Sequence, residues 1–296
     1  MNVLVSLLVL LGLMSAPGRW MQDGRRMHCA PTGISPMVAQ SPANPVWPEI
    51  EGEAWPDMSG HGGVAEFWGL EFDGDDYVSI PSSPSFAVDS TDDFLVQAWA
   101  NHDESGTHDI MVGGRVGDDG FEISINSSNQ GYCEFRVAGS GVYYTGTSTM
   151  PTGWNYHEMY VSRADAKLYY QINGVDIKTP ANCAAAIAPS AHPIAVGAQS
   201  RDGNMINHFG GDLVGVRMWI GTIPTPEQRA AWKYVSRLGP MPSLVFEYPM
   251  LPGYGQSVLD ASGNGHHGQR GSTSDEDTAD PAWIGEYAQL TSGGPR

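Results

Sequence analysis

The strongest constraint on this chain is a long series of short segments in which every second residue is apolar. The series begins near Glu66, and clear examples are Trp68–Phe72, Phe94–Ala100 and Tyr156–Ser162. Apolar residues at a period of two place one face of an extended strand against a core. Further strands are expected at 77–80, 121–125, 132–137, 168–172 and 213–220. The sequence therefore predicts a protein built from β-strands.

One tight turn and one helix are marked clearly. Asn173-Gly174 separates two alternating segments, and both residue types tolerate the positive φ angles of a type I′ hairpin turn. Thr225–Gln228 has the pattern of a capping box with a proline at the first helical position. Apolar residues at helical spacing extend this helix to Leu238, and Gly239-Pro240 predicts its end. Many strands with one late helix favour a β-sandwich.

Composition agrees with this fold class and excludes some partners. Charged residues are only 16 % of the chain, whereas there are 37 Gly and 21 Pro, which end strands and helices. The 33 acidic residues outnumber the 15 basic residues, which gives a net charge of -18. Such a chain repels phosphate backbones and anionic lipids, so neither nucleic acid nor a lipid surface is an expected partner. Glycans, divalent cations and other proteins remain open.

The N-terminal part of the chain lacks the alternation. Val3–Met14 is an apolar run of signal-peptide length, and it is too short for a comfortable membrane span. Residues 17–64 are rich in Pro and Gly, which predicts an arm or linker without ladder hydrogen bonds. Leaving the apolar side chains of Val3–Met14 exposed to water would cost free energy. We therefore expect residues 1–16 to be a cleaved signal peptide or an uncleaved apolar arm buried against a partner.

Several stretches resemble one family. Leu70–Pro81 (LEFDGDDYVSIP) resembles the opening motif of laminin-G-like, concanavalin A-like lectin/glucanase domains. Phe94–Trp99 (FLVQAW) resembles the family's F-T-V-E-A-W segment. Pro151–His157 (PTGWNYH) and then Leu168–Val175 (LYYQINGV) are similar to its P-x-G-x-W-Y-H-V and L-Y-V-N-G-V segments. Order and spacing also agree, and the resemblance covers residues 57–238.

The resemblance implies an all-β fold, a two-sheet antiparallel jelly-roll sandwich of the concanavalin A-like type. The sandwich is expected at 65–240, with an extended N-terminal arm and one short C-terminal helix. Residues 241–296 are a C-terminal extension, in which Asp260–Gly268 (DASGNGHHG) resembles a motif that normally precedes the sandwich in this family. We expect this extension to add an edge strand, and a truncated repeat is the alternative.

The family binds sugars, mediates adhesion and occasionally hydrolyses glycosides. We expect a non-catalytic, surface-exposed module for glycan binding or adhesion, outside the cell or on its surface. The alternative is a structural or decoration protein on the surface of a virus or phage particle, or of another assembly, with oligomer or lattice contacts through residues 1–64. Glycoside hydrolysis ranks third, because it needs two carboxylates on one strand face. Glu71, Asp73 and Asp75 have that spacing, but the run passes into a turn.

Calcium is the metal ion that the sequence favours. Some relatives hold this ion at the rim of the sandwich, and Asp73, Asp75 and Asp76 offer the hard oxygen ligands that calcium prefers. Asp202–Asn204 is a second candidate loop. The family's acidic pair in the closing strand is Val214-Gly215 here, so part of the family's ligand set is not matched.

The histidines give weaker signals. His157 shares a strand face with apolar residues, which predicts a hydrogen-bonded core histidine. His102 and His108 lie in an acidic stretch with Asp103 and Asp109, which predicts a solvated loop first and a metal site second.

The three cysteines are an odd number, so the sequence leaves open whether any two of Cys29, Cys133 and Cys183 form a disulfide. Cys133 alternates with apolar residues and is expected to be a buried thiol. The aromatic candidates for stacking on a sugar are Trp99, Tyr143, Tyr144 and Trp219, and the sequence assigns none of them to a glycan site.

Overall fold

The computed structural model describes residues 67–103, 108–117, 119–137, 140–183, 193–235, 237–250, 255–273, 275–278, 280–287, 290–291 and 294–295. The chain divides into two units, 1–51 and 52–296, and all described residues belong to the second unit. The segments 1–16 and 17–64 lie outside the described residues.

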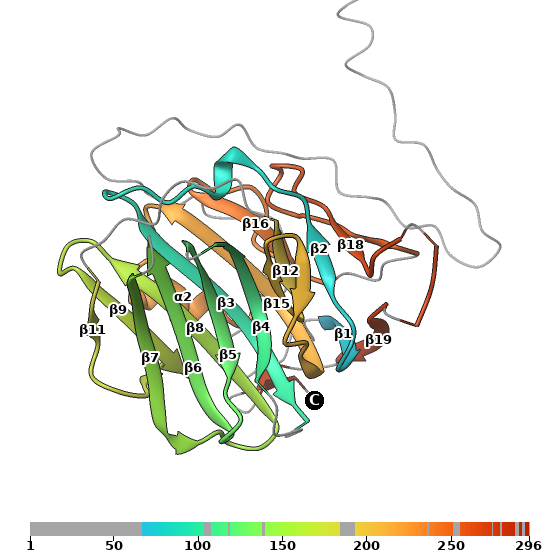
Figure 1. The fold of residues 1–296 in the computed structure, drawn as a ribbon, viewed down its shortest axis with the longest axis horizontal. Helices are drawn as coiled ribbons and strands as arrows, with labels where there is room; N and C mark the ends of the chain where they lie inside the picture. Colours follow the sequence, from blue (N-terminus) through green and yellow to red (C-terminus); the bar gives the residue numbers. More distant parts are fainter. Residues whose placement is uncertain are drawn as a thin grey trace, which may run out of the picture. The chain divides into compact units, whose positions relative to one another are not determined.

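Two β-sheets form the second unit (Figure 1). The strands of the first sheet are β1 (Phe67–Asp73), β3 (Asp93–His102), β8 (Trp154–Ser162), β9 (Lys167–Ile172), β10 (Val175–Asp176), β11 (Ala181–Asn182), β15 (Gly210–Gly221), β16 (Leu244–Tyr248) and β19 (Ala282–Tyr287). Their order is β10-β9-β8-β3-β15-β1-β19, with β11 beside β9 and β16 beside β15. All of these pairs are antiparallel.

The strands of the second sheet are β2 (Val78–Ile80), β4 (Asp109–Val116), β5 (Asp119–Ile125), β6 (Gln130–Val137), β7 (Ser140–Thr149), β12 (Ile194–Val196), β13 (Gln199–Arg201), β14 (Asn204–Ile206), β17 (Ser257–Val258) and β18 (Gly268–Arg270). Their order is β17-β18-β2-β12-β4-β5-β6-β7. The β13–β14 hairpin joins β4 through a parallel pairing of β13, the one exception to antiparallel pairing in this sheet. A 3-10 turn, η2 (Pro84–Phe86), follows β2, and a short pair, β20 (Leu290–Thr291) and β21 (Gly294–Pro295), lies near the end of the chain.

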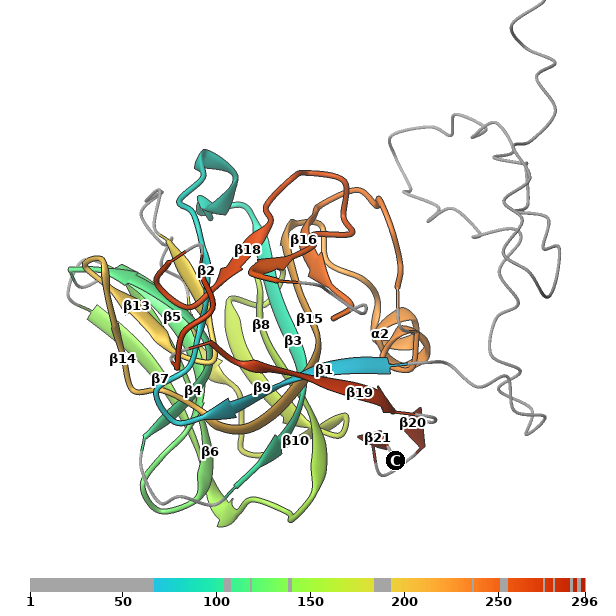
Figure 2. The same cartoon turned by 90° about the vertical axis from the view of Figure 1, so that its right-hand side faces the viewer.

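The core lies between the two sheets. It combines side chains from the first sheet, such as Val96 and Met159, with side chains from the second, such as Ile123 and Phe135. Inward residues alternate along strands that the sequence predicts, for example at Phe94, Val96 and Ala98 of β3. The predicted two-sheet antiparallel jelly-roll sandwich is therefore confirmed, and Figure 2 shows it from the side.

The predicted capped helix is present but shorter than expected. Thr225 and Gln228 form the capping box of α2 (Pro226–Trp232), the one α-helix among the described residues. The helix ends at Trp232 and does not reach Leu238. Carbonyl groups beyond this point bond to the first sheet, because Trp99 Nε1 donates to the Lys233 carbonyl at 2.8 Å and Arg217 Nη1 to that of Trp232 at 2.9 Å. The helix and the residues after it thus cover part of the outer face of the first sheet.

The C-terminal segments lie at the edge of each sheet. β18 pairs with β2, and β19 pairs with β1. The loop between β17 and β18 is organised around Asp260, whose Oδ1 accepts the amide of Glu247 on β16 at 3.0 Å. Asp260 Oδ2 accepts the amide of His266 at 2.9 Å, and the Asn264 amide donates to the Leu244 carbonyl at 2.7 Å. These bonds hold the DASGNGHHG loop against β16.

We expect Gly197→Ala to destabilise the fold much more than Gly153→Ala. Both glycines have left-handed φ angles, +79° and +77°, so both substitutions carry about 1 kcal/mol of backbone strain. A Cβ at Gly197 would also lie 2.1 Å from the Phe72 ring, whereas nothing lies within 4 Å of one at Gly153. Urea unfolding should show a loss of about 3 kcal/mol or more for Gly197→Ala. Equal losses for the two variants would contradict this packing.

Candidate functional site

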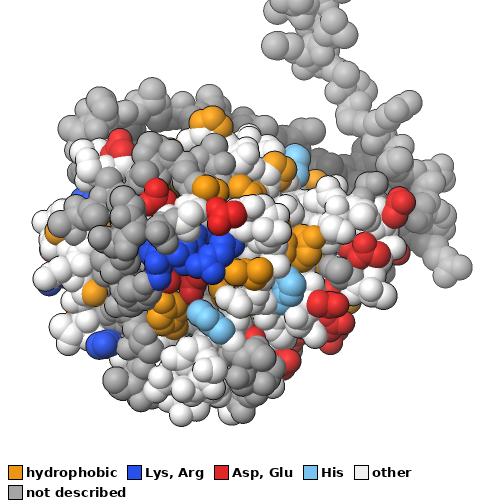
Figure 3. Space-filling view, viewed as in Figure 1, with side chains coloured by type: hydrophobic (Ala, Val, Ile, Leu, Met, Phe, Trp, Pro, Cys, Tyr) orange, Lys and Arg blue, Asp and Glu red, His pale blue; other side chains and the backbone are white. Residues whose placement is uncertain are grey.

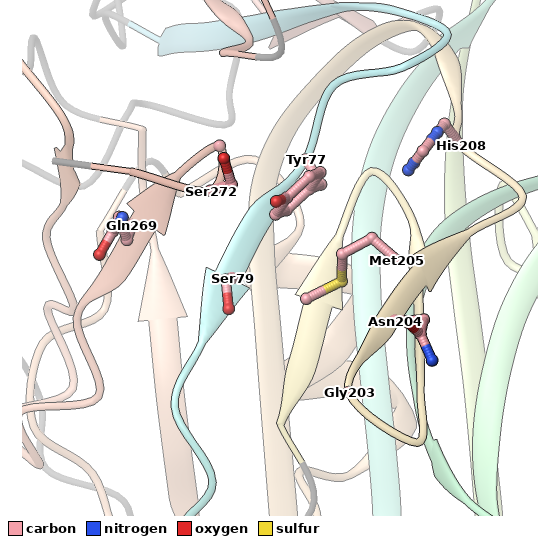
Figure 4. Close-up of a pocket in the computed structure, with 9 residues that line it drawn as sticks. Tyr77, Ser79, Gly203, Asn204, Met205, His208, Gln269 and Ser272 are labelled. Carbon is pink, nitrogen blue, oxygen red and sulfur yellow. The ribbon is translucent and has the colours of Figure 1, made fainter. Parts of the chain in front are cut away.

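A hollow of about 450 Å³ opens on the outer face of the second sheet (Figure 4). It lies between β2, β18 and the β13–β14 hairpin. The lining residues are Tyr77, Ser79, Gly203, Asn204, Met205, His208, Gln269, Gly271 and Ser272. The hollow therefore combines one tyrosine ring with amide, hydroxyl and imidazole groups.

The pleat of β2 positions one wall of the hollow. Val78 and Ile80 point into the core and are fully buried, so Tyr77 and Ser79 point outward. Ser79 pairs directly with Gln269 of β18, which brings an amide from the C-terminal extension beside the hydroxyl. The opposite wall is the hairpin, which turns at Asp202 and Gly203 with positive φ angles of 51° and 84°.

Tyr77 and His208 form a stacked pair. Their ring centroids are 6.0 Å apart, and the angle between the ring planes is 12°. Burial lowers the pKa of His208, and the nearby Asp75 carboxylate acts in the opposite direction. The imidazole thus lies beside a half-buried tyrosine ring. Such a ring can stack on the apolar face of a ligand.

The turn before Tyr77 brings the three predicted calcium ligands together. One carboxylate oxygen from each of Asp73, Asp75 and Asp76 lies within 4.8 Å of the others. Asp76 is only 3 % exposed; its Oδ2 accepts the Asp73 amide at 2.8 Å, but its Oδ1 is buried without a hydrogen-bond partner. Burial raises the pKa of Asp76 to about 6, and the Asp73 and Asp75 charges act in the same direction.

His102 and Asp109 do not lie in the solvated loop that the sequence predicts for them. His102 ends β3 and Asp109 begins β4, and their side chains are 7 % and 1 % exposed. His102 Nε2 lies 2.6 Å from Asp109 Oδ2 and 4.0 Å from Asp103 Oδ1. His108 points elsewhere and lies 3.3 Å from Glu122. The solvated loop is therefore wrong for His102 and Asp109, because both belong to strands.

The three carboxylates considered for catalysis do not all lie on one strand. Glu71 is exposed on β1 and Asp73 ends that strand, but Asp75 lies in the turn. Glu158 and Glu247, on the outer face of the first sheet, are buried under α2 and its following residues. Each has a cationic partner, Arg229 at 3.2 Å and Arg217 at 3.0 Å respectively.

The remaining sequence candidates are mostly core residues. Trp99 and Trp219 are buried, which removes both from any glycan site, and the side chains of Tyr143 and Tyr144 lie outside the description. Cys133 and Cys183 are free, buried thiols whose pKa values are raised by burial, and Cys29 lies outside the described residues. The predicted burial of Cys133 is thus confirmed.

Sequence reasoning missed the hollow. Tyr77 stands inside the opening motif, but nothing in that motif distinguishes an outward ring from a core ring. Asn204 and His208 are close in the chain, but both are far from Tyr77 and from Gln269, and only the strand pairing brings these segments together. The alternation of Val78 and Ile80 was the one available signal for Tyr77, because it places the intervening residues on the outer face.

The fold defines the class of protein as a jelly-roll β-sandwich of two antiparallel sheets. Residues 72–227 match the family model of the concanavalin A-like lectin/glucanases superfamily (Laminin_G_3). The match spans more than half of the chain, and the protein therefore belongs to this family. No curated protein sequence matches the chain.

The chain is similar to solved structures at low sequence identity. A candidate carbohydrate-binding protein from Bacteroides ovatus is 13 % identical, with a TM-score of 0.55, over 74 % of this chain and 60 % of that one. The chain thus spans about 60 % of that protein's length. Domains LG4-5 of the mouse laminin α1 chain are 12 % identical over 54 % of this chain and 43 % of theirs, with a TM-score of 0.41. Within the described residues no helix is long and apolar enough to cross a membrane.

His157 is the buried core histidine that the sequence predicts. Its Nδ1 lies 2.7 Å from the Tyr170 hydroxyl, and the side chain is fully buried. Burial, with a smaller effect from His102, lowers the pKa of His157 to about 3. The folded state therefore resists protonation of this ring.

We expect His157 to make the fold less stable in acid. The ring binds a proton in the unfolded chain below about pH 6.5 but in the folded protein only near pH 3, so stability should fall as the pH drops between these values. His157→Gln, which stays neutral, should show a smaller loss than the wild type between pH 7 and pH 4 in urea unfolding. Identical pH profiles for the two proteins would show that His157 is not responsible.

Proposed function

We propose that this protein is a non-catalytic glycan-binding or adhesion module that acts outside the cell or on a surface, and that the hollow beside Tyr77 receives a sugar. The supporting observation is the combination in that hollow of an oriented aromatic ring with Asn204, Gln269 and two serine hydroxyls. Sugars present apolar C–H faces that stack on aromatic rings and hydroxyls that bond to amides. The fold shared with the Bacteroides ovatus candidate carbohydrate-binding protein supports the same class of ligand.

The alternative, a decoration protein held to a particle by residues 1–64, depends on residues outside the description, so no observation favours it. Glycoside hydrolysis is also not proposed. The buried carboxylates Glu158 and Glu247 are bonded to arginines and covered by α2, which leaves no room there for a sugar ring.

We further propose calcium at the Asp73–Asp76 turn. The residues fit this ion, because three carboxylates converge there and Asp76 Oδ1 is buried without any donor. Asp73, Asp75 and Asp76 would hold it, and the ion would supply the positive charge that three neighbouring carboxylates lack. Because Tyr77 directly follows Asp76, a fixed turn also fixes the ring that faces the hollow.

The sugar site can be tested by substitution at Tyr77. Binding of neutral glycans, first found on an array and then measured by calorimetry, should weaken about three- to tenfold in Tyr77→Ala, because one stacked ring is lost. Gln269→Ala should also weaken binding. The matched control is Tyr169→Ala, since this tyrosine lies on the first sheet. Unchanged affinity in both hollow variants, or release of reducing sugar by the wild type, would refute the proposal.

Calcium should raise the melting temperature of the wild type, and EDTA should lower it in calcium-containing buffer. Because the pKa of Asp76 is raised to about 6, protons compete with the ion, and calcium affinity should fall as the pH drops through this value. Asp76→Asn should remove most of the calcium effect. In calcium-free buffer at pH 7 the same variant should be more stable than the wild type, because it removes a buried charge.

Melting curves that do not respond to calcium at pH 7 would contradict the metal proposal. Glycan binding that persists in EDTA would leave the hollow as the sugar site and would show only that the turn does not control it.

A further inference from the structure

The hollow beside Tyr77 has a lining without formal charge. Its nine lining residues include no Asp, Glu, Lys or Arg. The Lys and Arg side chains visible on this face gather over β4, β5 and β6 (Figure 3), and none of them lines the hollow. Burial lowers the pKa of His208, so this imidazole is neutral at pH 7. Because the chain has a net charge of -18 and repels anions, the hollow suits a neutral sugar better than a uronate.

Four polar side chains of the lining are open to a ligand. They are the amides of Asn204 and Gln269 and the hydroxyls of Ser79 and Ser272. Within the part of the chain that the structure describes, none of these four side chains makes a hydrogen bond to another residue. An amide side chain offers N–H donors and a carbonyl acceptor together. This pair of groups is the complement of a second amide, such as the acetamido group of an amino sugar.

Met205 gives the hollow an apolar contact in addition to the Tyr77 ring. It belongs to β14, is half-buried, and pairs with Ser200 across the hairpin. Figure 4 shows its side chain extending from the hairpin toward β2, the strand that follows Tyr77. A thioether side chain is apolar and adapts its shape to a neighbouring group. A sugar whose C–H face lies on Tyr77 would fill this second contact only if it carried an apolar substituent.

Building on the proposed sugar site, we propose that the hollow selects sugars with an N-acetyl group on the ring. The sugar ring stacks on Tyr77, the acetyl methyl group contacts Met205, and the acetamido N–H and carbonyl bond to the amide of Asn204 or Gln269. A plain hexose has neither the methyl group nor the amide. The volume of about 450 Å³ leaves room for the substituent, since small-molecule sites typically measure about 300–1,000 Å³.

The ligand test uses the full chain, a glycan array, and calorimetry with methyl glycosides. The panel contains N-acetylglucosamine, N-acetylgalactosamine, glucose, galactose, glucosamine and glucuronate. At least one N-acetylated sugar should bind about tenfold or more tightly than the hexose of the same configuration, because it adds a methyl contact and an amide hydrogen bond. Glucosamine, which has an amine in place of the acetamido group, and glucuronate should bind less tightly than the N-acetylated sugar.

The variants measure the ratio of the two affinities, N-acetylated sugar to hexose. Met205→Gln should lower this ratio about three- to fourfold, because the methyl group loses its apolar contact. Met205→Leu should keep most of the ratio, since leucine is apolar. The matched control is Val175→Gln, an apolar-to-amide change at a residue that is 67 % exposed on β10 of the first sheet. Circular dichroism and melting temperature first establish that each variant is folded.

Equal affinity for N-acetylated sugars and their hexoses in the wild type would overturn this inference. The proposed function would survive that result if Tyr77→Ala still weakened hexose binding. An unchanged ratio in Met205→Gln, or an equal fall in Val175→Gln, would also overturn the inference, as would tighter binding of glucosamine or glucuronate. Binding to no glycan of the array would overturn both the inference and the proposed function.

Discussion

Burial of every second side chain between the two sheets is the constraint from which the rest of the surface follows. Val78 and Ile80 must face the core, and this forces Tyr77 and Ser79 outward. The same pleat sends Glu122 outward while Phe121 and Ile123 stay inside. A shift of one residue in either strand would bury the polar groups and expose the core. The hollow is thus a consequence of the same packing that stabilises the sandwich.

The outer faces of the two sheets differ in what their polar residues do. On the first sheet, α2 and the residues after it cover buried ion pairs, among them Arg217 with Glu247, whose side chains are 2 % and 0 % exposed. Glu247 also accepts the amides of Leu238 and Gly239, so this pair fixes the segment that closes the face. Removing either partner would leave an uncompensated charge in the interior. The buried polar residues of the first sheet therefore stabilise the fold, and the candidate binding groups of the hollow lie on the second sheet.

Strands with strong alternation were predictable from the sequence, because their pattern records burial directly. β4 was not, since Gly113-Gly114 interrupts its apolar pattern, and β13 and β14 are too short to show a period. The meeting of Asp73, Asp75 and Asp76 follows from their proximity in the chain. The burial of Asp76 does not follow from it, because that burial depends on tertiary packing. The hollow escaped prediction for the same reason, since its walls meet only through strand pairing.

The edge strands of the C-terminal extension also affect how the chain can assemble. β19 pairs with β1, and β18 pairs with β2, so the first two described strands obtain their last neighbours only from the final part of the sequence. Contacts of such long sequence separation close large loops and slow the folding of β-proteins. During synthesis, the edges of β1 and β2 must wait for the ribosome to release the extension. Until then two unpaired edges are open to other chains, and such edges favour aggregation.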